Sequence, residues 1–182
     1  MQKRTRHPIV FTDLDGTLLN HRDYAFDDAM PALARIRSMH IPLIICTSKT
    51  RREVEYLRKG LQIDDPFIVE NGGGIFFPRD YRGFTIPEAI GFSEYKSIML
   101  GVPYAKIRYF IEVIRPFIPL SGFGDWNIAD IIARTGLSLE AATMAKEREF
   151  TEPFQMHDPV QLEELTRAAR MEGLSITRGG RF

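Results

Sequence analysis

Short apolar runs alternate with amphipathic stretches over the first 80 residues of the chain. The runs with the length and β-branched content of buried strands are "PIVFTDLD", "IPLIICT" and "DPFIVE". Residues 27–40 and 50–60 lie between them and place apolar side chains at helical spacing. Thr50 and Glu53 form a capping box at the start of the second helical stretch, and Asp27 or Asp28 is placed to cap the first. The order strand, helix, strand, helix, strand predicts a parallel sheet with right-handed crossovers.

The pattern changes after this first region. Residues 80–95 carry prolines and glycines without a sustained period, which is typical of a linker or entry loop. Helical and strand-like patterns then resume, and the chain ends on "LSITRGGRF", which predicts the start of a last strand. We therefore expect an α/β protein with two domains, residues 1–82 and residues 83–182.

Composition narrows the classes of partner. The formal net charge is zero, which argues against nucleic-acid or membrane-surface binding driven by bulk charge. No segment approaches the ~18 apolar residues of a membrane span. The single cysteine, Cys46, lies in an apolar run, so we expect a buried, inert thiol and a reducing, cytoplasmic setting.

Polar side chains follow each of the three predicted strands, namely Asp13 and Asp15, Thr47, and Asn71. Ligands of parallel sheets bind beyond the carboxyl ends of the strands. Side chains two residues apart share a face only while a strand stays extended. The turn "DGT" ends the strand here, and it lets both aspartates approach one site. A carboxylate pair suits a hard cation such as Mg²⁺. One carboxylate can also attack phosphorus while the second transfers protons. The alternative is a plain acidic turn.

The longer string "VFTDLDGTLL" resembles the D-x-D-G-T-L signature of the haloacid dehalogenase superfamily. The resemblance implies a Rossmann-like parallel-sheet core with an inserted α/β cap domain. It also implies that Asp13 is the nucleophile, and that Asp15 is the general acid/base with its backbone carbonyl on Mg²⁺. Thr47 would bind the transferring phosphoryl group. Its alternative role is a helix cap, which Thr50 fills better.

Within the superfamily, several stretches are similar to the mannosyl-3-phosphoglycerate phosphatase family. They are "TSKTRREVEYLRKGL", "PFIVENGGGIFFP", "AKEREFTEPF" and "TRGGRF". This resemblance implies hydrolysis of mannosyl-3-phosphoglycerate to mannosylglycerate, a compatible solute. The alternatives are another sugar-phosphate phosphatase of the superfamily and a binder of phosphorylated ligands that does not turn them over.

A phosphorylated glycerate carries a phosphate and a carboxylate, so cations and flexible backbone should surround it. The candidates for substrate binding are Ser48, Lys49, Asn71, Gly72, Arg148, Arg178 and Gly180. The alternatives are solvated surface charges for the cations and a hairpin turn for Asn71 and Gly72.

The resemblance also implies two later motifs, a lysine that neutralises the phosphoryl group and an acidic G-D-x-x-N-D-like segment on Mg²⁺. The sequence contains no such acidic string, and Lys49 belongs to the second motif rather than the third. We therefore expect an incomplete core in which Asp13 and Asp15 hold Mg²⁺ weakly. The open sheet should favour association, including a homo-oligomer, or completion of the core by another chain. A truncated product is the other explanation.

Overall fold

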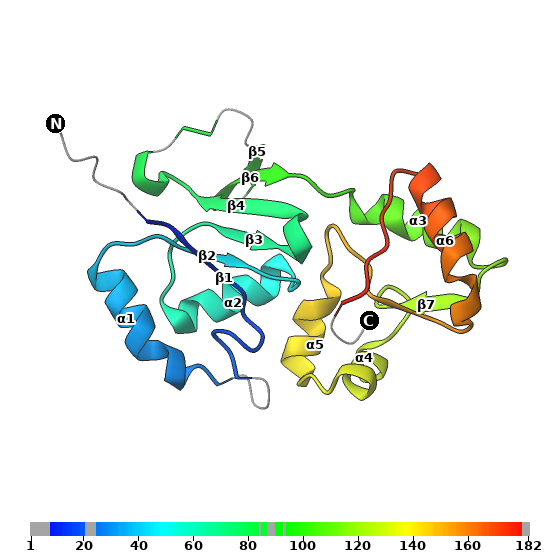
Figure 1. Cartoon of the computed structure of the whole chain (residues 1–182), viewed down its shortest axis with the longest axis horizontal. Helices are drawn as coiled ribbons and strands as arrows, with labels where there is room; N and C mark the ends of the chain where they lie inside the picture. The colour runs from blue at the N-terminus through cyan, green and yellow to red at the C-terminus, as the bar shows by residue number, and fades with distance from the viewer. Residues whose placement is uncertain (1–7, 21–24, 84, 87–89, 93, 180–182) are drawn as a thin grey trace. The chain divides into compact units, whose positions relative to one another are not determined.

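The computed structural model describes residues 8–20, 25–83, 85–86, 90–92 and 94–179 of the chain (Figure 1). The chain divides into two compact units, Met1–Leu100 and Gly101–Phe182. Both units combine helices and strands, which confirms the predicted α/β class.

The first unit is built on a six-stranded sheet with the order β1-β2-β3-β4-β6-β5. Its strands are β1 (Val10–Thr12), β2 (Leu43–Cys46), β3 (Phe67–Val69), β4 (Gly74–Pro78), β5 (Ile90–Phe92) and β6 (Tyr95–Met99). The strands β1, β2 and β3 are parallel, as predicted, whereas β4, β6 and β5 add in antiparallel pairs. Because β5 and β6 belong to this sheet, the chain divides after Leu100 rather than after residue 82, and residues 80–95 are more than a linker.

Two helices connect the parallel strands, α1 (Met30–Ser38) and α2 (Arg51–Leu61). The predicted capping box is present, because Glu53 N donates to Thr50 Oγ1 at 3.2 Å and Thr50 N donates to Glu53 Oε2 at 2.8 Å. The prediction that Asp27 or Asp28 caps α1 is wrong. Both lie in a 3-10 turn (Asp27–Ala29) that precedes the helix, and neither side chain makes a capping hydrogen bond.

The two faces of the sheet differ. Figure 1 shows α1 and α2 on the same side of the sheet, as right-handed crossovers between adjacent strands require. On that side Ile45, Phe67 and Phe76 are fully buried, and the two phenylalanine rings stack with centroids 5.4 Å apart. Because strand side chains alternate, Phe11 and Cys46 lie on the opposite face, where Phe11 is 63% exposed. The prediction of a buried Cys46 is therefore wrong, since its thiol is exposed.

The second unit packs four helices with a two-stranded antiparallel sheet, β7-β8. Its elements are α3 (Tyr104–Ile114), β7 (Leu120–Gly122), α4 (Ile128–Thr135), α5 (Leu139–Lys146), β8 (Phe154–Met156) and α6 (Leu162–Met171). One apolar cluster surrounds Trp126 and Ile131, and a second surrounds Ile118 and Leu165.

The predicted last strand is not formed over the part of it that the structure describes, residues 174–179. The chain instead closes the end of α6, where Leu174 N donates to Ala169 O at 2.9 Å, and Ile176 packs against the cluster around Leu165. A strand needs a hydrogen-bonding partner along its length, which a local apolar pattern does not supply. Within the described ranges, no helix has the length and apolar character needed to cross a membrane.

Candidate active site

The carboxyl ends of β1, β2 and β3 lie at one edge of the sheet because these strands are parallel. Asp13 follows β1, Thr47 follows β2 and Asn71 comes shortly after β3. Backbone hydrogen bonds join the last two segments, since Thr47 N donates to Ile68 O at 3.1 Å and Asn71 N donates to Thr47 O at 3.0 Å. The structure therefore brings the site residues predicted for the first unit to a single rim.

The turn after β1 fixes the two aspartates. Leu14 and Leu19 are buried, and Leu19 N donates to Leu14 O at 2.8 Å, so the loop folds back on itself. Gly16 has a φ of 72°, a conformation that favours glycine. Asp13 stays exposed, and its Oδ1 accepts a hydrogen bond from Leu14 N at 2.7 Å. The backbone thus orients one oxygen of a carboxylate that ligands can reach.

Asp15 belongs to a chain of charged contacts. Its Oδ1 lies 3.1 Å from Lys49 Nζ, and the same Nζ lies 3.8 Å from Glu53 Oε1. The side chains of Lys49 and Glu53 are 11% and 8% exposed. The sequence predicted Glu53 only as part of the capping box. Its spacing of four residues from Lys49 also favours an ion pair between the two side chains.

Thr47 is buried, and its Oγ1 accepts a hydrogen bond from Lys49 N at 3.3 Å. The helix-cap alternative for Thr47 fails, since Thr50 caps α2. Ser48 is exposed. Asn71 and Gly72 have φ values of 57° and 95°, so they form a tight turn into β4 at the same rim.

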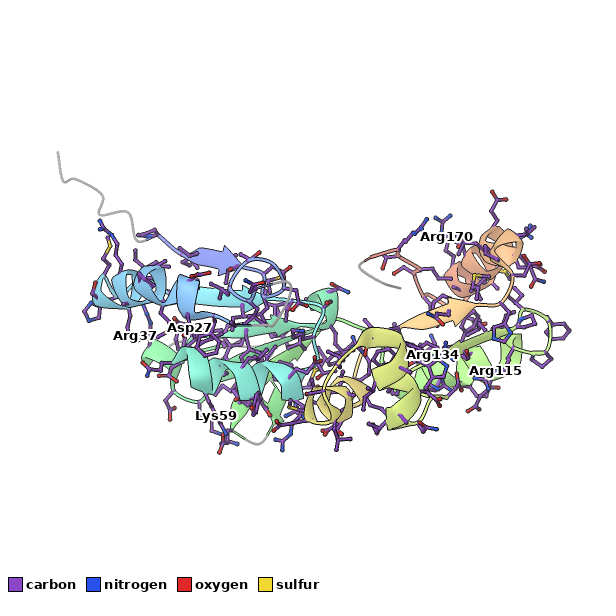
Figure 2. All side chains as sticks on the ribbon, turned by 90° about the horizontal axis from the view of Figure 1, so that it is seen from below. Asp27, Arg37, Lys59, Arg115, Arg134 and Arg170 are labelled. Carbon is purple, nitrogen blue, oxygen red and sulfur yellow. The ribbon has the colours of Figure 1, made fainter. Side chains whose placement is uncertain are left out.

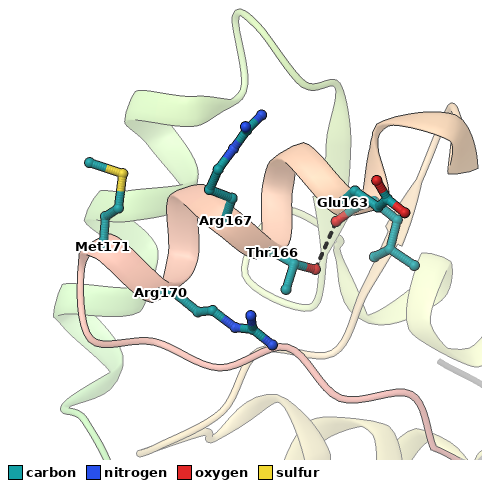
Figure 3. A pocket seen from close by; sticks show the side chains of 6 residues that line it. Glu163, Thr166, Arg167, Arg170 and Met171 are labelled. Carbon is teal, nitrogen blue, oxygen red and sulfur yellow. Dashed lines mark hydrogen bonds between the residues drawn. The ribbon is translucent and has the colours of Figure 1, made fainter.

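The remaining candidates belong to the second unit. Arg148 is bound locally, with Nε donating to Thr151 O at 3.2 Å and Nη2 donating to Thr151 Oγ1 at 2.5 Å. Arg178 is exposed, and Gly180 lies outside the described residues. A hollow of about 690 Å³ runs along α6 in the same unit. Figure 3 shows it between side chains such as Arg167 and Arg170, and none of the predicted site residues lines it.

A second charged cluster, which the sequence analysis did not single out, surrounds the loop after β7. Arg108 and Arg115, the latter labelled in Figure 2, each donate to Asp125 at 2.5 Å. Arg108 also donates to Glu152 at 2.8 Å, and the Tyr104 hydroxyl donates to Glu152 at 2.5 Å. These charged side chains therefore bind one another within the second unit.

Two pKa shifts in this cluster follow from its contacts. Burial alone raises the pKa of Asp125, but hydrogen bonds from Arg108, the Gly122 amide and Arg115 outweigh it and lower the pKa to about 2. Burial and the hydrogen bond to Glu152 raise the pKa of Tyr104 well above its usual value. The Asp125 carboxylate therefore stays ionised at neutral pH, and the hydrogen bonds it accepts stabilise the loop.

The rim offers oxygen ligands for Mg²⁺, namely the exposed Asp13 carboxylate and the backbone carbonyl of Asp15. Mg²⁺ is commonly held by one or two carboxylates and several waters, and this pair fits that mode of binding. No group of three or more His, Cys, Asp or Glu side chains suited to a metal occurs among the residues that the structure describes. The donor set therefore fits a hydrated cation.

Comparison with known proteins identifies the class. The profile of the haloacid dehalogenase-like hydrolase family matches residues 10–109, and the chain belongs to this family. Two solved structures share the fold. One is Thermoplasma acidophilum 0175, with a TM-score of 0.61, 16% identity, and coverage of 96% of this chain and 62% of that one. The other is a haloacid dehalogenase-like hydrolase from Bacteroides thetaiotaomicron, with a TM-score of 0.63, 14% identity, and coverage of 97% and 69%.

The curated relatives are more specific. The chain is 51% identical over 174 residues to the glucosyl-3-phosphoglycerate/mannosyl-3-phosphoglycerate phosphatase of Persephonella marina, covering 96% of this chain and 64% of the relative. The protein of the same description from Methanococcoides burtonii is 41% identical over 180 residues, with coverage of 96% and 65%. The mannosyl-3-phosphoglycerate phosphatase of Pyrococcus horikoshii is 33% identical over 175 residues, with coverage of 96% and 69%. The chain thus spans about two thirds of the length of these relatives.

Proposed function

We propose that this chain carries the nucleophile-bearing part of a phosphatase that acts on mannosyl-3-phosphoglycerate, with the glucosyl compound as the alternative substrate. The observation that carries the proposal is the 51% identity to a phosphatase of both compounds over 96% of the chain. The rim geometry supports it, since carboxylates and a hydroxyl of the predicted types meet at one sheet edge.

The reaction would proceed in two displacements. An oxygen of Asp13 forms a bond to phosphorus as the bond from phosphorus to the glycerate oxygen breaks, and Asp15 donates a proton to that leaving oxygen. Asp15 then takes a proton from water, whose oxygen attacks phosphorus and releases phosphate, so the Asp13 carboxylate is regenerated. The exposure of Asp13 and the partial exposure of Asp15 are what these steps require.

Other rim groups would bind the phosphoryl oxygens. Thr47 supplies its hydroxyl, and Ser48, Asn71 and Gly72 supply polar side-chain or backbone groups at the same edge. Mg²⁺ bound by Asp13 and by the Asp15 carbonyl would neutralise phosphoryl charge. This ion would be held weakly, because no three His, Cys, Asp or Glu side chains are grouped to hold a metal among the described residues.

The second unit would serve as the cap that recognises the sugar and the glycerate, with Arg148, Arg178 and Gly180 as the proposed contacts. The bonds between Arg148 and Thr151 leave this arginine less available than a free side chain. Arg178, which is exposed, is therefore the better candidate for the carboxylate of the glycerate.

The exposed face of the core sheet supports the proposal that copies of the chain associate. Phe11 is exposed there, and β1 is an edge strand with one side unpaired within the described sheet. We propose a homo-oligomer formed through this face in a cytoplasmic setting. Light scattering of the purified chain should give a mass above that of a monomer, and Phe11→Ser should lower it. A monomeric wild-type chain would contradict the proposal.

The function is tested by phosphate release from mannosyl- and glucosyl-3-phosphoglycerate and from a panel of unrelated sugar phosphates, with and without Mg²⁺. We expect Mg²⁺-dependent release from the two glycerates, absent in Asp13→Asn. Faster release from another sugar phosphate would contradict the proposed substrate but would keep the chain among the sugar-phosphate phosphatases. If a folded chain binds the glycerates without releasing phosphate, it is a binder of phosphorylated ligands. Turnover would then require the later lysine and acidic motifs.

A further inference from the structure

We propose that Lys49 is a positioning residue, which holds the Asp15 carboxylate in the place that proton transfer requires. The proposal rests on the function proposed above and departs from the expectation that Lys49 binds the substrate. It stands on one juxtaposition, in which a largely buried Lys49 bridges Asp15 of the β1 loop and Glu53 of α2.

The backbone of Lys49 is anchored on both sides. Its amide donates to Thr47 Oγ1 at 3.3 Å, and its carbonyl accepts from Glu70 N at 3.0 Å. The segment between β2 and α2 is therefore tied to the segment that follows β3. From this fixed base the Lys49 side chain extends to the carboxylate of Asp15, where its ammonium group is 3.1 Å away.

Glu53 holds the other side of the lysine. Its Oε2 accepts from Thr50 N at 2.8 Å and from Thr50 Oγ1 at 3.0 Å, so the start of α2 fixes this carboxylate. Its Oε1 is then left facing the Lys49 ammonium group at 3.8 Å. The order of contacts runs from the helix through Glu53 and Lys49 to Asp15, and a rigid element thereby sets the position of a loop side chain.

The Oδ1 atom of Asp15 shows why the lysine matters. This atom is buried, and no described N–H or O–H group donates to it with hydrogen-bond geometry, so the charge of Lys49 is its compensation. A buried carboxylate oxygen without a compensating partner is costly. Loss of the ammonium group should therefore let the Asp15 carboxylate turn toward solvent, to which its 38% exposed side chain already has access.

The two roles for Lys49 make opposite kinetic predictions. A substrate-binding lysine contributes to affinity, so its removal raises KM. A lysine that acts through Asp15 contributes to the proton-transfer steps, so its removal lowers kcat. Because the ammonium group is already shared between two carboxylates, the geometry favours the second outcome.

The test compares Lys49→Met, Lys49→Arg and Glu53→Gln with the wild-type chain. Lys49→Met should lower kcat about 10- to 100-fold and leave KM within about twofold. Lys49→Arg keeps the charge and should recover at least half of the lost kcat on a logarithmic scale. Glu53→Gln should lower kcat less than Lys49→Met does. The matched control is Arg52→Met, which removes an exposed cation of α2 and should change neither kcat nor KM. A raised KM with an unchanged kcat would overturn the proposal.

Crystal structures of the wild-type chain and Lys49→Met give a readout that does not need turnover. The Asp15 carboxylate should change rotamer in Lys49→Met while α2 stays in place. An unmoved carboxylate would overturn the positioning role even in an active enzyme. A wild-type chain without phosphate release, together with a displaced Asp15 in Lys49→Met, would contradict the proposed function alone.

Discussion

The two units use their carboxylates in opposite ways. At the rim of the first unit, Asp13 accepts one backbone hydrogen bond and remains exposed. In the second unit, Asp125 accepts hydrogen bonds from two arginines and from the Gly122 amide. A carboxylate whose acceptor capacity is filled stabilises the fold, whereas one with unfilled capacity can bind a cation or attack a substrate. Charge alone therefore does not identify a functional residue.

The largest expected effect is on chemistry at the rim. Asp13→Asn should lower phosphate release by about 10³-fold or more, because it removes the nucleophile, while the free energy of unfolding changes by less than about 0.5 kcal/mol. Initial-rate assays and denaturant unfolding of the same preparation measure both. Loss of activity that coincides with unfolding would mean that Asp13 stabilises the fold. The contrast between Asp13 and Asp125 would then be wrong.

The next effect is on the stability of the second unit. Asp125→Asn should lower the free energy of unfolding by about 2–3 kcal/mol, because it removes the charged acceptor of Arg108 and Arg115. Trp126 is the only tryptophan of the chain and lies beside Asp125, so its fluorescence during denaturant unfolding reports on this unit. Glu112→Gln, an exposed change in the same unit, serves as the control and should stay within about 0.5 kcal/mol.

Acidification should reproduce part of the Asp125 effect. Folding lowers the pKa of Asp125 from 3.8 to about 2, so between these values the unfolded chain binds more protons than the folded chain. The stability that this group contributes is then complete above about pH 4 and is lost as the pH falls toward 2. Unfolding curves at pH 5 and pH 3 should diverge more for the wild-type chain than for Asp125→Asn. Equal losses in both would show that other groups dominate.

The smallest expected effect concerns Arg134 (labelled in Figure 2), whose guanidinium carbon lies 4.5 Å from the centre of the Trp126 ring and which donates to Gln155 at 2.8 Å. Arg134→Met should cost about 0.5–1 kcal/mol of unfolding free energy, because the Arg134 side chain is exposed. Arg167→Met on α6 removes an exposed arginine and controls for the change in net charge. A cost equal to that of Asp125→Asn would mean that stacking, rather than the ion pairs, stabilises the loop.

Local patterns were sufficient for the parallel part of the core and for its rim. The apolar runs ending at Thr12 and Cys46, together with the Thr50–Glu53 capping box, are short-range features, and the structure contains each of them. Because parallel strands end at one edge, these features also placed Asp13 and Thr47 together.

The features that the sequence did not reveal depend on long-range pairing. The strands β5 and β6 join the core sheet through β4, and nothing in residues 80–95 specifies that partner. The exposure of Cys46 follows from which face of the sheet the helices cover, which its own apolar run does not encode. The contact of Lys49 with Asp15 likewise depends on how two loops lie beside each other.

The exposed thiol of Cys46 has a practical consequence. It is the only cysteine of the chain, it lies in the first unit, and the only tryptophan lies in the second. A single maleimide dye attached there would form a donor–acceptor pair with Trp126, and the efficiency of energy transfer would report on the separation of the two units. Titrating a phosphorylated glycerate against this transfer signal would show whether ligand binding changes their separation, without adding or removing a residue.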